Sequence, residues 1–120
     1  MSIWYTRNIK MSKLTLSHID HIVLLVSDFA RSKAFYSSFL GSPTEETGDT
    51  FAYKIGPTKL FFATAGNPAS GFDKENVGLN HLAFHAANLE ELKECMKKLD
   101  GASIKHSGIQ IDKYGGREFI

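Results

Sequence analysis

Ile19–Gly41 reads I-D-H-I-V-L-L-V-S-D-F-A-R-S-K-A-F-Y-S-S-F-L-G, and this stretch decides the fold because the chain contains its pattern twice. The second copy, Leu79–Gly101, reads L-N-H-L-A-F-H-A-A-N-L-E-E-L-K-E-C-M-K-K-L-D-G and aligns with the first without a gap. Each copy has a histidine (His21 or His81), then an apolar strand pattern, a capping Asp or Asn, and a helix pattern that ends in glycine. Such a repeat predicts two equivalent structural modules.

Composition narrows the class of protein. The chain has 120 residues, of which 42% are hydrophobic, and this size and composition suit one compact domain. Its 14 basic and 13 acidic residues are spread along the sequence, so we expect no nucleic-acid partner. It has one cysteine, Cys95, and neither a secretory signal nor an apolar run long enough to span a membrane. We therefore expect a cytoplasmic protein without a membrane partner.

The first copy predicts one strand, one helix and three further strands. His18–Ser27 is an almost continuous apolar run of strand length, and Asp28 is placed to cap a helix that ends at Gly41. Weak strand character follows in Pro43–Thr50, and a hairpin is predicted from strands Thr50–Gly56 and Lys59–Ala65.

The second copy predicts a shorter version of the same module. Asn80–Ala87 is its opening strand, and Asn88 with Glu91 forms a capping-box-like pair at the start of its helix. Two strands are expected after that helix, in Ala102–Gln110 and from Arg117 to the last residue. We divide the chain into an N-terminal extension (1–13), a first module (14–66), a linker (67–78) and a second module (79–120), which form one α+β domain.

The repeated histidines define the candidate site. Residues two apart on a strand share a face, so His21 lies opposite the apolar face of its strand, which should carry the helix. A pseudo-twofold axis between the modules would bring His21 and His81 together, and two neutral imidazoles form the core of a divalent-metal site. The simpler alternative is that both histidines have a structural role in a cleft that binds no metal.

Other residues are candidates for binding a ligand in the same cleft. His85 shares a face with His81, and we expect it to lie in the cleft or on its rim. Most aromatic residues of the hairpin should belong to the core, but we assign Tyr53 and Phe62 to the cleft, where they would suit a flat or apolar small molecule. Lys54 and Lys59 could meet an anion, although solvated edge positions are the simpler expectation.

The motifs H-I-D-H-I-V-L-L-V-S-D, F-Y-S-S-F-L-G and G-L-N-H-L-A-F-H resemble those of the vicinal oxygen chelate superfamily. This superfamily includes glyoxalase I, fosfomycin-modifying enzymes, extradiol dioxygenases, methylmalonyl-CoA epimerase and bleomycin-resistance proteins. The resemblance implies paired βαβββ modules that form a cupped mixed sheet. It also implies metal ligands at His21 and His81 and further carboxylate ligands on the fourth strand of each module.

The chain departs from this pattern at both fourth strands. Lys59–Ala65 contains no Glu or Gln, and the sequence stops at Ile120, before the strand that usually carries the essential Glu. The second module is therefore expected to lack its last strand and the site its third ligand. We expect either Ser2–Ile9, as an added β-strand, or a partner chain to cover the gap.

Two functions from different classes follow. The first is a glyoxalase- or bleomycin-resistance-like protein that binds a small molecule in the cleft between the modules and is catalytically incomplete as it stands. The alternative is a lyase, transferase or dioxygenase that uses a divalent metal (Zn, Ni, Mn or Fe) on a small oxygen-bearing substrate. A homodimer is expected in either case. No catalytic residue or substrate is identified by the sequence.

Overall fold

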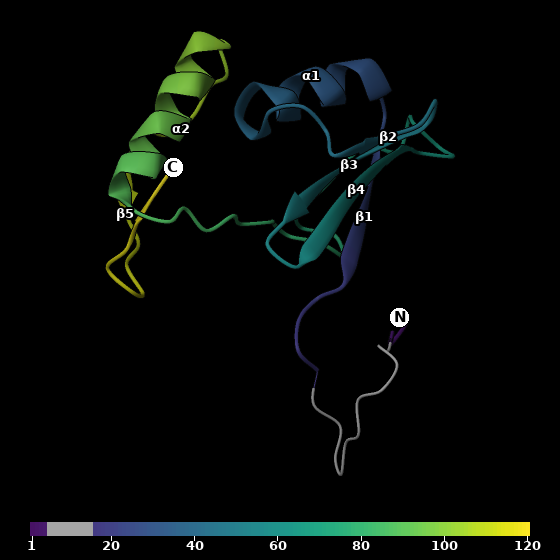
Figure 1. The fold of residues 1–120 in the computed structure, drawn as a ribbon, viewed down its shortest axis with the longest axis horizontal. Coiled ribbons are helices and arrows are strands. Elements are labelled where there is room, and N and C mark those ends of the chain that lie inside the picture. Colours follow the sequence, from purple (N-terminus) through teal and green to yellow (C-terminus); the bar gives the residue numbers. More distant parts are fainter. Residues whose placement is uncertain (5–15) are drawn as a thin grey trace.

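The computed structural model describes residues 1–4 and 16–120, and it forms an α+β fold with one mixed sheet and two helices (Figure 1). The strand order of the sheet is β1-β4-β3-β2, with β1 parallel to β4 and the other pairs antiparallel. The elements of the first module are β1 (His21–Val26), α1 (Phe29–Leu40), β2 (Glu45–Glu46), β3 (Thr50–Ile55) and β4 (Thr58–Thr64). The strand, helix and hairpin predicted for this module are confirmed.

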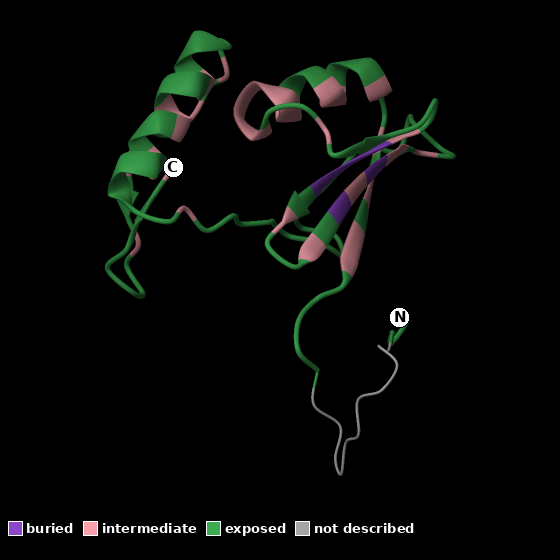
Figure 2. Ribbon diagram, viewed as in Figure 1, coloured by how far each residue is buried: buried purple, intermediate pink, exposed green. Residues whose placement is uncertain are grey.

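Helix α1 covers one face of this sheet and encloses the core. Phe51, Tyr53, Leu60 and Phe62 form the buried cluster, and the side chains of β1 that pack against it are those of the predicted apolar face, Ile22, Leu24 and Val26. Figure 2 shows the buried positions on the two central strands, β3 and β4. The opposite face of the sheet remains open, and Val23 and Leu25 are exposed there.

Both helices begin at the caps that the sequence predicts. The Asp28 carboxylate accepts a hydrogen bond from the backbone N–H of Arg31 at 3.0 Å, and the Asn88 side chain accepts one from Glu91 at 2.9 Å. The Glu91 carboxylate in turn accepts from the backbone N–H of Ala87 at 2.5 Å, one residue before the cap, so the pair resembles a capping box shifted by one donor. At the end of α1, Gly41 takes a φ of 80°, a left-handed value that suits glycine.

The second copy differs from the prediction in its strands. Its helix α2 (Leu89–Gly101) is present, but residues 80–86 form no strand, and only β5 (Gln110–Ile111) and β6 (Glu118–Phe119) follow as a small hairpin. In Figure 1 the segment before α2 runs as an extended connection away from the sheet. A strand requires a neighbour for its backbone hydrogen bonds, and β5 and β6 pair only with each other, so no second sheet forms around this segment.

The N-terminal extension lies mostly outside this description. The added strand predicted for Ser2–Ile9 falls largely on residues outside the described part of the chain, and residues 1–4 carry no strand. Of the two helices in the described ranges, neither has the length and apolar character that crossing a membrane requires.

Candidate functional site

A row of three polar side chains crosses the open face of the sheet. The cross-strand register places His21 of β1 opposite Lys59 of β4, and Lys59 opposite Lys54 of β3. Residues paired in this way project from the same face. This row borders a cavity of about 530 Å³ lined by Trp4, Asp20, His21, Lys54, Pro57, Lys59 and Phe61.

The imidazole of His21 is held by its neighbours. Its Nδ1 lies 2.8 Å from Oδ2 of Asp20, and because an ionised carboxylate only accepts, this geometry favours a proton on Nδ1. The ring of Trp4 meets the His21 ring edge-on at 5.1 Å, and that of Phe61 does so at 6.0 Å. Nε2 is then the ring nitrogen left for a ligand.

His81 in the second copy is oriented by an equivalent hydrogen bond to the residue that precedes it. Its Nδ1 lies 2.7 Å from Oδ1 of Asn80, the residue that corresponds to Asp20. Metal-binding histidines characteristically donate their second ring N–H to a carboxylate or carbonyl oxygen in this way. The repeat therefore extends to the hydrogen bond that sets the tautomer of each imidazole.

The structure does not assemble these histidines into a metal site. Within residues 1–4 and 16–120, no group of three or more His, Cys, Asp or Glu side chains is placed to hold a metal ion. Over the same ranges, no hydrogen bond or ring contact joins His21 to His81. Each imidazole fits the role of a ligand, but the donor set that a divalent metal requires does not come together in this conformation.

The two lysines of the row differ in their partners. Lys59 Nζ lies 2.5 Å from Oε1 of Glu45 on the neighbouring edge of the sheet. For the exposed Lys54, no carboxylate lies within salt-bridge distance among the residues described. Of the two lysines, Lys54 is therefore the one without a salt-bridge partner in the described part of the chain.

The assignment of Tyr53 and Phe62 to the cleft needs correction. Phe62 is 0% exposed and Tyr53 is 3% exposed, and both pack in the core beneath α1, on the face opposite His21. The Tyr53 hydroxyl lies 2.8 Å from Oγ of Ser37 in α1. Their place follows from register, because residues that alternate with Lys54 and Phe61 must face the helix.

His85 lies on the extended segment before α2, where it is exposed, and it does not line the His21 cavity. Phe61 and Trp4 line this cavity although neither was assigned to a site. Strand alternation could have found Phe61, since it lies opposite Val23, on the face of His21. No sequence signal pointed to Trp4, which lies outside the repeat.

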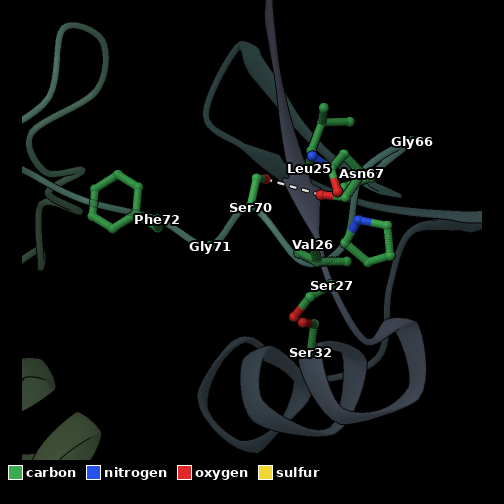
Figure 3. A pocket seen from close by; sticks show the side chains of 11 residues that line it. Leu25, Val26, Ser27, Ser32, Gly66, Asn67, Ser70, Gly71 and Phe72 are labelled. Atoms are coloured by element: carbon green, nitrogen blue, oxygen red, sulfur yellow. Dashed lines mark hydrogen bonds between the residues drawn. The ribbon is translucent and has the colours of Figure 1, made fainter.

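A second cavity, of about 490 Å³, lies where β1 leads into α1 (Figure 3). Its lining includes Leu25, Val26, Ser27, Ser32, Asn67, Ser70 and Phe72. The Ser70 hydroxyl donates to the backbone carbonyl of Asn67 at 2.9 Å, the dashed line in Figure 3, and the lining contains no charged side chain. This cavity therefore has fewer charged side chains to orient a ligand than the cavity beside His21.

Comparison with known proteins identifies the family. The profile of the Glyoxalase/Bleomycin resistance protein/Dioxygenase superfamily matches residues 18–120. Two uncharacterised bacterial proteins are similar over 88% of this chain: YwkD of Bacillus subtilis (strain 168) is 28% identical, with 88% of its own length covered, and YaeR of Escherichia coli (strain K12) is 26% identical, with 87% covered.

Two crystal structures share the fold. A protein from Bacillus halodurans that is provisionally named a glyoxalase is 31% identical, with a TM-score of 0.63 over 71% of this chain and 68% of that one. The structure of SMU.1112c is 24% identical, with a TM-score of 0.65 over 87% of this chain and 88% of that one. The family profile, the relatives and the fold agree, and the chain belongs to the glyoxalase/bleomycin resistance protein/dioxygenase superfamily.

Proposed function

We propose that this protein binds a small molecule in the cavity beside His21. The observation that carries the proposal is the fixed imidazole of His21, held at Nδ1 by Asp20 and flanked by the rings of Trp4 and Phe61. A volume of about 530 Å³ falls in the range of small-molecule sites, which combine apolar walls with a few placed polar groups.

The same cavity supports a role in binding rather than turnover. Among the described residues of its lining, Asp20 is the one that carries a carboxylate, and that carboxylate is engaged with Nδ1 of His21. A carboxylate that acts as a general base must be free to reach the proton that it abstracts, and Asp20 is already used to orient the ring, so the described lining holds no free carboxylate beside Nε2 of His21. We therefore propose a catalytically incomplete member of the family that holds its ligand without converting it.

The single tryptophan of the chain lies in this cavity and provides the test. Titration with a panel of small aromatic and polar compounds should change the fluorescence of Trp4 in the wild type, and His21→Ala should weaken the response. His18→Ala is the matched control, because His18 pairs with Ser17 outside the cavity. An equal response in the wild type and in His21→Ala would contradict the proposed site.

A divalent-metal-dependent lyase, transferase or dioxygenase is the second candidate. It is favoured by the matching orientation of His21 and His81, each held at Nδ1 so that Nε2 is left for a ligand. A bound metal would supply Lewis-acid chemistry at the oxygens of a substrate. His21 and His81 would hold it once residues 79–86 approached the sheet.

Metal content distinguishes the two candidates without an assay of activity. Purified wild type exposed to Zn, Ni, Mn or Fe should retain one of these metals under the second candidate, and both His21→Ala and His81→Ala should lose it, while His18→Ala should not. Equal metal content in all four proteins would exclude the second candidate.

We also propose that the protein forms a homodimer. Leu79, Leu82 and Phe84 lie on the segment that forms no strand, and they are 44%, 37% and 41% exposed. The ring of Phe84 lies 6.4 Å from that of Phe39 of α1. Burying these side chains against a second copy would remove apolar surface from water and offer the segment backbone partners.

A further inference from the structure

Lys54 and Lys59 are an unfavourable pair for stability alone. They lie directly opposite each other on adjacent antiparallel strands, and like charges in this arrangement destabilise a sheet. Glu45 offsets the charge of Lys59, yet Lys54 has no such partner in the described part of the chain. Both lysines line the same cavity as His21.

The aromatic walls of this cavity complement the charged row. Phe61 lies two residues after Lys59 on the same face of β4, beside His21, and the ring of Trp4, which is 65% exposed, also meets the imidazole edge-on. A flat ring can pack against these side chains, while Lys54 and Lys59 line the part of the cavity that the β3–β4 hairpin forms. Oxyanions form the stronger, charge-assisted hydrogen bonds with ammonium groups.

We infer that the ligand is an aromatic oxyanion whose ring packs against Trp4 and Phe61 and whose charged oxygens bind Lys54 and Lys59. This inference rests on the proposed function, since it names the chemistry of the ligand in the same cavity. The Asp20 carboxylate also lines this cavity and keeps its negative charge, but its Oδ2 is directed to Nδ1 of His21 at 2.8 Å, so the oxyanion is expected at the lysines of the hairpin. A carboxylate and a phosphate monoester share the required chemistry.

Three probes of similar shape test this inference by isothermal titration calorimetry. Benzoate and phenyl phosphate carry the charge of a carboxylate and of a phosphate, and benzamide is a neutral analogue of benzoate. Both anions should bind more tightly than benzamide at low salt, and added salt should reduce this preference because it screens exposed charges. The anion that binds more tightly shows whether the natural ligand carries a carboxylate or a phosphate.

Substitution of Lys54 tests whether its ammonium group binds the anion. Lys54→Met should weaken binding of the preferred anion by about five- to tenfold and leave benzamide unchanged, as expected for the loss of one partly exposed charge-assisted hydrogen bond. Lys54→Arg should retain the anion. Lys105→Met is the matched control, because Lys105 is exposed and lies outside the cavity.

The outcomes separate this inference from the function on which it rests. If benzamide binds as tightly as the anions, or if Lys54→Met weakens the anions no more than Lys105→Met does, the inference is overturned and binding in the cavity stands. If none of the three probes binds, both the inference and the proposed function lose their support.

Discussion

At the scale of single residues, the core depends on stacked aromatic rings. Phe62 is 0% exposed, and its ring stacks on that of Phe51 at 4.7 Å with an interplanar angle of 11°. Phe62→Ala should lower the free energy of unfolding by about 3–5 kcal/mol, because it leaves a cavity in a packed core. Phe72→Ala, at a side chain that is 70% exposed, should change it by less than about 0.5 kcal/mol. Urea denaturation measures both, and equal losses would contradict this account of the core.

Cys95, on the half-buried side of α2, is expected to react slowly as a nucleophile. Burial raises the pKa of its thiol, Lys98 opposes that shift, and Glu91 adds to it. A raised pKa means less thiolate at neutral pH, so alkylation by iodoacetamide should be slower than that of glutathione and should accelerate as the pH rises.

Lys98→Met should slow the reaction of Cys95 further, because it removes the one charge that favours the thiolate. Lys97→Met is the control, since Lys97 makes no such contribution to the pKa of the thiol. A Lys98→Met protein that reacts as fast as the wild type would show that Lys98 does not act on Cys95.

At the scale of secondary-structure elements, the two helix caps should have different consequences. Helix α1 covers the core, so Asp28→Ala should lower the global free energy of unfolding by about 1 kcal/mol, and Asp28→Asn should largely preserve it. No residue of helix α2 is among the described side chains that form this core or pack against it, so Asn88→Ala should increase amide hydrogen exchange mainly within α2. An equal loss of global stability from both alanine variants would contradict this distinction.

The elements that the sequence predicted well are those whose partners are local. Each helix has its own cap and apolar face, and the β3–β4 hairpin closes around Gly56, which has a φ of 56°. His18–Ser27 and Asn80–Ala87 have similar apolar patterns, yet only the first contains a strand. The two segments differ in their neighbours, because β1 pairs in parallel with β4, while none of the described strands pairs with residues 80–86.

At the scale of the whole molecule, the candidate site joins segments that are distant in the sequence. The repeat identified His21 without any structure, because the same residue type recurs in the second copy. The neighbours of His21 could not be found in that way. Phe61 and the two lysines depend on the register between β1, β4 and β3, and Trp4 comes from outside both copies.

The mass of the assembled protein tests the proposed homodimer. Light scattering should give twice the chain mass of 13.3 kDa, and Leu82→Glu should shift the protein toward the single-chain mass by placing a charge in the interface. Ile111→Glu is the matched control, since Ile111 is exposed on the separate β5–β6 hairpin. A wild type of single-chain mass would rule the dimer out.

The position of the core in the sequence also bears on the order in which the chain folds during synthesis. The five buried hydrophobic residues of the described part of the chain all fall in the range 51–62, and the helix that covers them precedes them. A ribosome therefore completes everything that this core requires before it begins the second copy, and chains generally fold from the N-terminal side as they emerge. The later half then meets a nucleus that is already formed, and its own arrangement adds little to the stability of that nucleus.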